Sequence, residues 1–250
     1  AGSIQSPAIL QRSGVGSAAI LSPLEIPVIV DNPNVGDNIQ NHVGTYVSAV
    51  GLTKPNLPPP FSDQGFVAFT DIPGSVFVGQ GRIFQFGLTV DPNGNSFGNP
   101  AFILQPKSKG KIKIMNKNPM IDPKLSLNAF TDGTVSDPES DASALVAGLR
   151  YIAAKVNADG GFMVVPPQDL FFMDNTDNAG DLAIFNFARS CETIIVTNHI
   201  SGSCRMSKTA ATGVVNGNLH VHGTTGLMVA DNSVGPVIED GNNCFQAYII

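Results

Sequence analysis

Short apolar runs separated by turn residues dominate the pattern between Val43 and about Met115. Four runs, at residues 46–50, 65–69, 82–86 and 101–104, are divided by Pro, Gly and Asn. Because no helical spacing intervenes, the pattern predicts consecutive strands of an antiparallel sheet. Residues 55–60 hold four prolines, and we expect a loop there because proline cannot donate to a strand ladder.

A helix is predicted at the N-terminal end of the chain. Ser6 is the expected N-cap and Pro7 the first helical residue, and apolar residues follow. Gly14 provides a left-handed C-cap that ends this helix. The brief apolar run Ile26–Val30 then predicts a strand.

The helical pattern is clearest in the second half of the chain. Asp137 is the expected N-cap and Pro138 the first residue of this helix. Gly160 and Gly161 are expected to end it. Apolar residues recur between them at helical spacing, namely Ala142, Leu145, Val146, Leu149, Ile152, Ala153 and Val156. This stripe predicts a helix packed on the sheet.

Composition supports a folded protein without a nucleic-acid ligand. Hydrophobic residues make up 42% of the 250 residues and charged residues 14%, which fits a compact core. The net charge of −6 comes from dispersed acids. Residues 107–113 alternate lysine with small or apolar residues, which predicts a half-exposed strand. One such strand neutralises few phosphates, so nucleic acid is not expected as the main ligand.

Cysteine spacing and hydropathy bear on metal binding, disulfides and membrane insertion. Cys191, Cys204 and Cys244 form no CxxC or Cys/His motif, so we expect neither a metal site nor a disulfide framework. One disulfide with one free thiol stays open, and the compartment is not indicated. We expect no membrane span and no signal peptide. Both ends fall within ongoing patterns, which predicts that these residues are part of a longer chain.

Two segments far apart in the sequence carry the most specific motifs. Residues 2–16 read GSIQSPAILQRSGVG, and residues 33–42 read PNVGDNIQNH. The second segment opens with HISGSCRM at residues 199–206. It continues with GVVN at 213–216, LHVHG at 219–223, GLMVADNSV at 226–234 and GNN at 241–243.

These motifs resemble the GMC oxidoreductase family, named for glucose, methanol and choline oxidoreductases. The first segment resembles the internal family signature of Ser-Pro, two aliphatic residues and Ser-Gly-aliphatic-Gly. The second resembles the C-terminal block HPVGTCRMG, VVD, LRVHG, LRVxDxS and GNP. The resemblance is densest over residues 1–42 and 196–245.

The resemblance implies an FAD-dependent oxidoreductase that oxidises an alcohol by hydride transfer to flavin N5. By this resemblance His199 is the base that removes the hydroxyl proton, a role that suits the near-neutral pKa of histidine. Asn242 is the second catalytic residue and would hydrogen-bond the substrate oxygen without competing for the proton. His42, His220 and His222 are read as structural.

The resemblance also implies which residues contact FAD. The expected cofactor-binding residues are Gly2, Ser3, Asp231, Asn232, Asn242 and Asn243. Glycine lets the chain pass close to a cofactor, and backbone N–H groups near the flavin stabilise negative charge on its reduced ring. The Gly-x-Gly-x-x-Gly fingerprint of a dinucleotide-binding βαβ unit is absent from these residues. We therefore expect that unit in the remainder of the chain.

The sequence departs from the family motifs at several positions. Asn41 stands where aspartate is usual, and Asn216 replaces the last residue of VVD. Asn243 replaces the proline after Gly-Asn, which fixes the backbone beside the flavin in the family. Residues 238–240 read Ile-Glu-Asp, where family members commonly have a sequence of the Pro-Thr-Gly type before the Gly-Asn motif.

The predicted architecture is α+β with two domains. Residues 1–44 and 200–250 are expected to complete an FAD-binding Rossmann-like domain. Residues 45–199 form the expected substrate-binding domain, an antiparallel sheet backed by helices.

Two other functions stay open at this stage. The first alternative is a structural or packaging protein of a large assembly that reuses the GMC fold. The second is an enzyme similar to the hydroxynitrile lyases. The expected partners are a small-molecule alcohol, oxygen or another electron acceptor, and the remainder of the chain. Homo-oligomers and larger assemblies also stay open.

Overall fold

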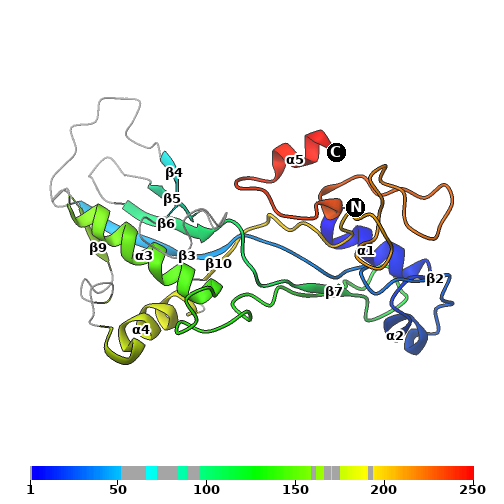
Figure 1. Ribbon diagram of the computed structural model, residues 1–250, viewed down its shortest axis with the longest axis horizontal. Helices are drawn as coiled ribbons and strands as arrows, with labels where there is room; N and C mark the ends of the chain where they lie inside the picture. The colour runs from blue at the N-terminus through cyan, green and yellow to red at the C-terminus, as the bar shows by residue number, and fades with distance from the viewer. Residues whose placement is uncertain are drawn as a thin grey trace. The chain divides into compact units, whose positions relative to one another are not determined.

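A computed structural model describes residues 2–51, 66–71, 84–88, 96–158, 162–165, 170, 175–190 and 194–250. The chain is mixed helix and strand, and it folds into two compact units (Figure 1). Unit 1 comprises residues 1–41, 108–129 and 197–250, and unit 2 comprises residues 42–107 and 130–196. The segment 108–129 therefore lies in unit 1, whereas the division based on sequence placed it with the substrate-binding domain.

Unit 2 is built on a six-stranded sheet in which every pair is antiparallel. The order is β10 (Ile194–Val196), β3 (Val43–Gly51), β6 (Ser96–Ile103), β5 (Phe84–Leu88) and β4 (Phe66–Thr70), and β9 (Phe162–Val165) also pairs with β3. The predicted antiparallel sheet is confirmed. The predicted loop at residues 55–60 lies outside the described residues.

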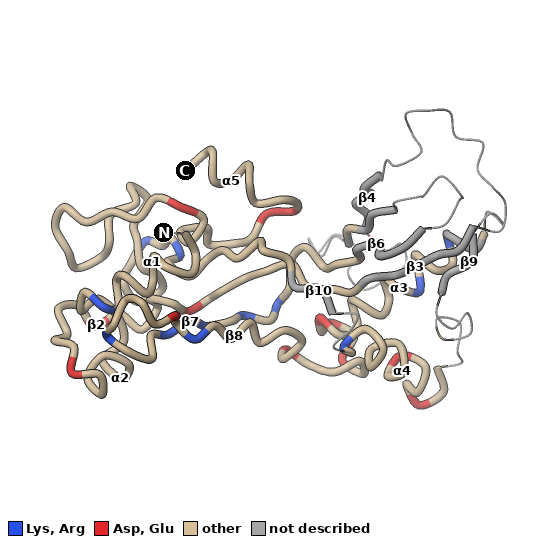
Figure 2. The backbone as a smooth tube through the Cα atoms, turned by 180° about the vertical axis from the view of Figure 1, so that it is seen from behind, with Lys and Arg blue, Asp and Glu red and all other residues tan. Residues whose placement is uncertain are grey.

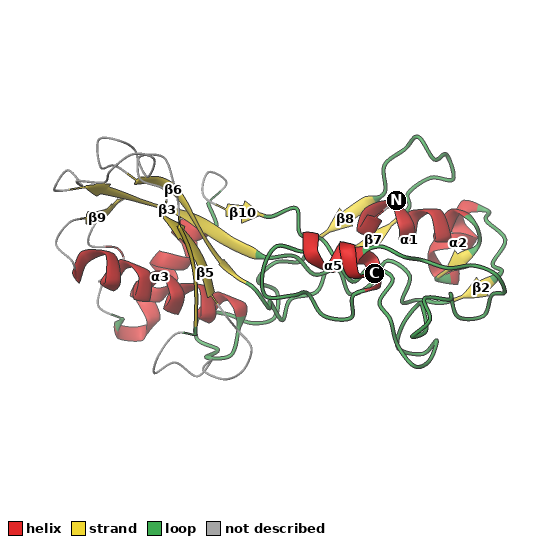
Figure 3. Ribbon diagram, turned by 90° about the horizontal axis from the view of Figure 1, so that it is seen from above, coloured by secondary structure: helices red, strands yellow, loops and turns green. Residues whose placement is uncertain are grey.

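Two helices of unit 2 pack together beside this sheet (Figure 3). They are α3 (Asp141–Ala158) and α4 (Ala179–Ala188), the latter preceded by the 3-10 helix η4 (Thr176–Asn178). The predicted stripe of α3 is buried at Ala142, Leu145, Val146, Leu149, Ile152 and Ala153. These side chains share a core with Ala101 and Ile103 of β6, so the predicted packing of helix on sheet is confirmed. The side chain of Val156 is not among those described. The predicted helix end at Gly160 and Gly161 also lies outside the described residues.

The predicted start of α3 at Asp137 is wrong by one turn. Asp137 Oδ1 accepts from the N–H of Glu139, only two residues on, at 3.0 Å. Its side chain therefore stabilises a turn that precedes the helix. Ser140 is the true cap, because its Oγ accepts from the N–H of Ser143 at 3.0 Å.

Unit 1 consists of short elements joined by long connections. They are α1 (Gly2–Arg12), β1 (Val15–Gly16), α2 (Ala18–Leu21), η1 (Ser22–Leu24), β2 (Val30–Asp31), β7 (Lys111–Lys113), β8 (Lys124–Ser126), η5 (Asn232–Val234) and α5 (Cys244–Ile249). Its larger core contains Leu10, Val15, Val35, Cys204, Val214, Val215, Val221, Val229 and Val234. These residues come from both motif-bearing segments, so the two segments fold together.

Helix α1 begins five residues earlier than predicted, and Ser6 is not its N-cap. Pro7 lies inside the helix and has no N–H, so it cannot bond the carbonyl of Ser3 one turn before it. Ser203 Oγ donates to that carbonyl instead, at 2.7 Å. The predicted end is confirmed, because α1 ends at Arg12 and Gly14 has a φ of +85°.

The strand predicted at Ile26–Val30 is mostly wrong. Only Val30 belongs to β2, which pairs in parallel with the two residues of β1. The N–H groups of Ile29 and Val30 both donate to Gly14 O, at 2.8 and 3.1 Å, instead of forming a longer ladder. The partner strand is too short to pair residues 26–29.

The half-exposed lysine strand is confirmed over part of its predicted range. In β7, Ile112 is buried between exposed Lys111 and Lys113, and β7 pairs with β8 (Figure 2). Across the part of the chain that the structure describes, no helix is long and apolar enough to cross a membrane. Cys204 and Cys244 are free thiols, whereas Cys191 lies outside the described residues.

Candidate functional site

His199 lies in unit 1, in an extended segment that Asn41 holds in place. The backbone N–H of His199 donates to Asn41 Oδ1 at 3.1 Å. Two residues earlier, Thr197 Oγ1 donates to the same oxygen at 2.6 Å, and Asn41 Nδ2 donates to Thr197 O. The N–H groups of Gln40 and Ser201 each donate to the other's carbonyl at 3.0 Å. The segment that carries His199 is thus tied to residues 40 and 41.

The side chain of Asn242 lies close enough to the His199 imidazole to affect its pKa. Burial lowers the pKa of His199 below its ordinary value, and the contact with Asn242 opposes this effect in part. The imidazole is half-buried, so it keeps an exposed part. At neutral pH this ring is therefore predominantly neutral and able to accept a proton.

The approach to Asn242 is fixed by Gln40, which is 1% exposed. Gln40 Nε2 donates to Pro236 O at 3.1 Å, and its Oε1 accepts from the N–H of Ile238 at 3.2 Å. Lys109 Nζ donates to the same Oε1 at 2.7 Å. One buried amide therefore links three segments that are distant in sequence.

Asp231 holds the first turn of α1. Its Oδ2 accepts from the N–H of Gly2 at 3.2 Å and from Ser6 Oγ at 2.6 Å, and its Oδ1 accepts from the N–H of Ser233 at 2.8 Å. Burial raises the pKa of Asp231, but the hydrogen bonds from Ser233, Ser6 and Gly2 outweigh it, so the net pKa is lowered. The carboxylate is ionised at neutral pH, and both of its oxygens are engaged by the protein.

The remaining predicted cofactor-binding residues meet in the same region. Asn232 Nδ2 donates to Asn243 O at 3.0 Å, and the carbonyl of Ser3 accepts from Ser203 Oγ. His199 thus lies with Asn242, Gly2 with Asp231, and Asn232 with Asn243. Since Asp231 and Asn242 precede Asn232 and Asn243 in the chain, these three pairs form one connected set. Ser3 follows Gly2 in α1.

Two buried polar atoms in this set are available to a polar ligand. Ser3 Oγ and Asn232 Oδ1 have no hydrogen-bond partner within the described ranges. A buried polar atom without a partner costs about 1–3 kcal/mol, so a ligand that bonds these atoms would be favoured. Gly2 has a φ of +75°, and a Cβ there would meet no atom within 4 Å. The backbone is therefore open to close approach at this point.

Two family departures keep the geometry that the usual residues provide. Asn216 Oδ1 accepts from the N–H groups of Asn218 at 2.9 Å and His220 at 3.1 Å, a role that needs only an acceptor. Asn243 has a φ of −75°, within the range that proline imposes. Neither replacement therefore distorts the backbone of the motif in which it lies.

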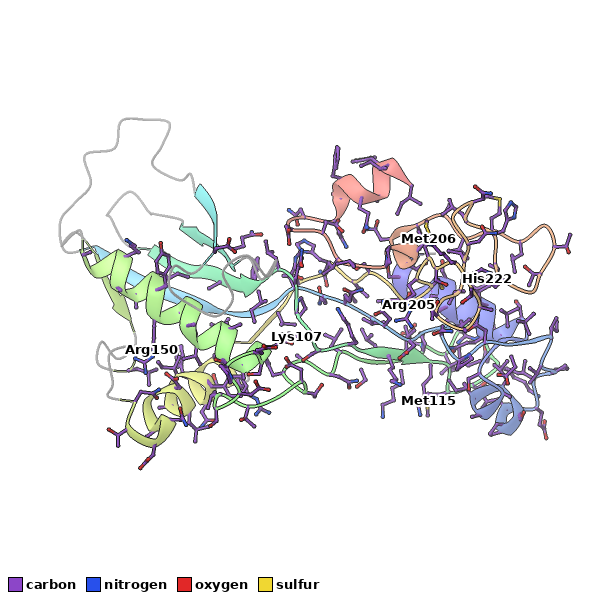
Figure 4. The ribbon with its side chains drawn as sticks, in the orientation of Figure 1. Lys107, Met115, Arg150, Arg205, Met206 and His222 are labelled. Carbon is purple, nitrogen blue, oxygen red and sulfur yellow. The ribbon has the colours of Figure 1, made fainter. Side chains whose placement is uncertain are left out.

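The other histidines and Cys204 do not join this site. His42 is fully buried in unit 2 and stacks on Phe102 with ring centroids 6.5 Å apart. His222, labelled in Figure 4, has Nε2 3.2 Å from Ser207 O, and His220 is exposed. Burial raises the pKa of Cys204 to about 12, so its thiol is unreactive at neutral pH.

Sequence reasoning missed the two residues that position the catalytic candidates. Gln40 and Asn41 are 1% and 3% exposed although both are polar. The available signal was a polar run directly after Ile39, within a motif that was already recognised. Arg205, labelled in Figure 4, instead joins other parts of unit 1, since it donates to Asn34 Oδ1 at 3.1 Å and to Thr212 O at 2.7 Å.

Comparisons with known proteins identify the family. A GMC oxidoreductase family profile matches residues 106–250, more than half of the chain. An oxygen-dependent choline dehydrogenase of Pseudomonas savastanoi pv. phaseolicola is 28% identical over 96% of this chain and 45% of its own length. The chain therefore spans about half the length of such relatives.

Solved structures of similar proteins share the fold. A fungal aryl-alcohol oxidase matches with a TM-score of 0.76 and 21% identity, over 99% of this chain and 52% of its own. A formate oxidase of Aspergillus oryzae, studied for the modification of its FAD, matches with a TM-score of 0.76 and 21% identity, over 99% and 51%. With the family profile and the site geometry, these matches give one conclusion: the chain belongs to the GMC oxidoreductase family.

Proposed function

We propose that the chain is the C-terminal part of an FAD-dependent oxidoreductase that oxidises an alcohol. Unit 1, which comprises residues 1–41, 108–129 and 197–250, would complete a Rossmann-like FAD-binding domain, and unit 2 would contribute the substrate-binding domain. Family membership supports this proposal, as do relatives named for choline, an aryl alcohol and FAD.

The adjacent side chains of His199 and Asn242 carry the proposal. A base for an alcohol must be neutral before the reaction, and burial keeps His199 in that form by lowering its pKa. The contact with Asn242 acts in the opposite direction and therefore favours the protonated ring. The imidazole is thus ready to accept the hydroxyl proton, and Asn242 stabilises the imidazolium that results.

The residues of this site fit the FAD that the family implies. Ser3 Oγ and Asn232 Oδ1 would bond polar atoms of the cofactor, because both are buried and lack a protein partner among the described residues. Gly2 would let the cofactor approach the backbone, and the N–H groups of Asn242 and Asn243 would face its flavin end. Asp231 would act indirectly, by holding Gly2 and Ser6. When bound, FAD supplies the acceptor for the hydride at flavin N5.

The test uses the full-length protein and its visible absorption spectrum. A panel of primary alcohols is added without oxygen, and one of them is expected to bleach the flavin bands. The bleaching should be lost in His199→Ala and kept in the control His220→Ala, since His220 is exposed and outside the site. Reoxidation by air or by an added acceptor then shows whether oxygen is the electron acceptor.

Two other outcomes would contradict the proposal. Bound flavin that no alcohol reduces would favour a lyase or a structural role. A full-length protein without flavin would favour a structural or packaging protein that reuses the fold.

A further inference from the structure

The proposed reaction leaves Asn41 without a role, although its side chain is 3% exposed and makes three hydrogen bonds. Its Oδ1 accepts from Thr197 Oγ1 at 2.6 Å and from the backbone N–H of His199 at 3.1 Å. Its Nδ2 donates to Thr197 O. Two of these bonds join Asn41 to Thr197, and the third joins it to His199, the proposed base.

Only an amide satisfies this arrangement in full. The site requires one donor, for the carbonyl of Thr197, and an acceptor that serves two donors. A carboxylate keeps the acceptor but lacks the donor, so the bond from residue 41 to the carbonyl of Thr197 would be lost. Asn41 also ends the first segment of unit 1, and Thr197 begins the last one. The bonds therefore fix His199 at the point where the chain re-enters this unit.

We propose that Asn41 is a positioning residue for His199, which fixes the backbone of residues 197–199 so that the imidazole meets Asn242. The inference rests on the proposed function for its kinetic consequence, but the placement of the ring can be tested without turnover. Lys109, which bonds Gln40, and Glu239 and Asp240, which precede Asn242, are the charged residues of the adjoining segments. None of the substitutions below changes them.

The first variant is Asn41→Leu, which keeps a similar volume and removes all three bonds. A reacting group displaced by about 1 Å loses roughly 100-fold in rate, so kcat should fall by this order while KM and flavin content change little. The pKa of His199 should shift, because displacement of the ring changes both its burial, which lowers this pKa, and its contact with Asn242, which raises it. Selective labelling of histidine, with His199→Gln for assignment, makes this pKa measurable by NMR.

Two further variants keep the test decisive if Asn41→Leu fails to fold. Asn41→Asp retains both acceptor bonds and should recover most of kcat on the high-pH plateau. Thr197→Val keeps its shape, loses one donor to Asn41 and should give a smaller effect in the same direction. Asn216→Leu is the matched control, because Asn216 Oδ1 also accepts from two donors, the backbone N–H groups of Asn218 and His220, in a different turn. It should leave the titration of His199 and kcat unchanged.

The outcomes separate this inference from the proposed function. An unchanged His199 titration in the Asn41 and Thr197 variants would overturn the inference, whether or not an alcohol is oxidised. A shifted titration in a protein that oxidises no alcohol would support Asn41 as a positioning residue and contradict the proposed function. A shifted titration with a fall in kcat would support both.

Discussion

Replacing Asp231 by alanine should loosen the first turn of α1. The substitution removes three hydrogen bonds, from the N–H of Gly2, from Ser6 Oγ and from the N–H of Ser233. The last is the capping bond of η5, and such bonds contribute about 1 kcal/mol. The other two are bonds to a half-buried carboxylate and contribute about 1 kcal/mol each after allowance for solvent. The sum is about 3 kcal/mol.

Hydrogen exchange of the full-length protein measures this change locally. The two bonds to α1 account for about 2 kcal/mol of this sum, and their loss makes amide exchange in α1 roughly 30-fold faster. Exchange in α3 of unit 2 should not change, and Asp122→Ala, at an exposed aspartate of unit 1, should leave α1 protected. Equal protection of α1 in wild type and Asp231→Ala would refute the reasoning.

The pH dependence of this protection follows from the sign of the pKa shift. The pKa of Asp231 is lowered in the folded protein, so its contribution is complete above the ordinary aspartate pKa. It is lost as pH falls below about 4 and passes through the lowered value. Wild-type protection should therefore approach that of Asp231→Ala in acid, and a constant difference across this range would contradict the assignment.

Three other predictions concern different parts of unit 1. The acid limb of kcat/KM for the proposed oxidation should lie below pH 6.5, the ordinary histidine pKa. Burial lowers the pKa of His199, and only the neutral ring accepts a proton. An acid limb above pH 6.5 would contradict the assignment of His199 as the base. Gly14→Ala should destabilise unit 1 by at least about 1 kcal/mol in urea unfolding. Gly14 has a φ of +85°, and the new Cβ would lie 2.5 Å from Pro27 O. Unchanged stability would argue against this packing. Iodoacetamide at pH 8 should modify exposed Cys244 and spare buried Cys204 until the protein unfolds, as peptide mass spectrometry would show.

The sequence predicted those elements whose pattern is local. The strands of unit 2 and the buried stripe of α3 follow from alternating or helical apolar spacing, and both were confirmed. The helix starts were predicted less well. Ser6 and Asp137 have the residue types of N-caps, but Ser6 Oγ bonds Asp231, 225 residues away, and Asp137 stabilises a preceding turn. Propensity alone cannot reveal a partner so distant in sequence.

The candidate site was predicted by resemblance, and its supports were not. His199 and Asn242 stand out because their motifs are specific, and the structure brings their side chains close together. Gln40 and Asn41 have no feature in the sequence that marks them as buried. Their roles depend on carbonyls and N–H groups of segments about 150 to 200 residues away. Such contacts follow from tertiary packing, which no local pattern encodes.

The proline inside α1 has a consequence for the order of folding. Because Pro7 has no N–H, the carbonyl of Ser3 accepts its hydrogen bond from Ser203 Oγ instead. The first turn of α1 therefore depends on a partner 200 residues away. Closing so long a loop is slow, and its entropy must be offset before the contact stabilises anything. During synthesis, this turn must therefore wait until Ser203 has left the ribosome. We expect it to be among the last parts of unit 1 to become protected in refolding.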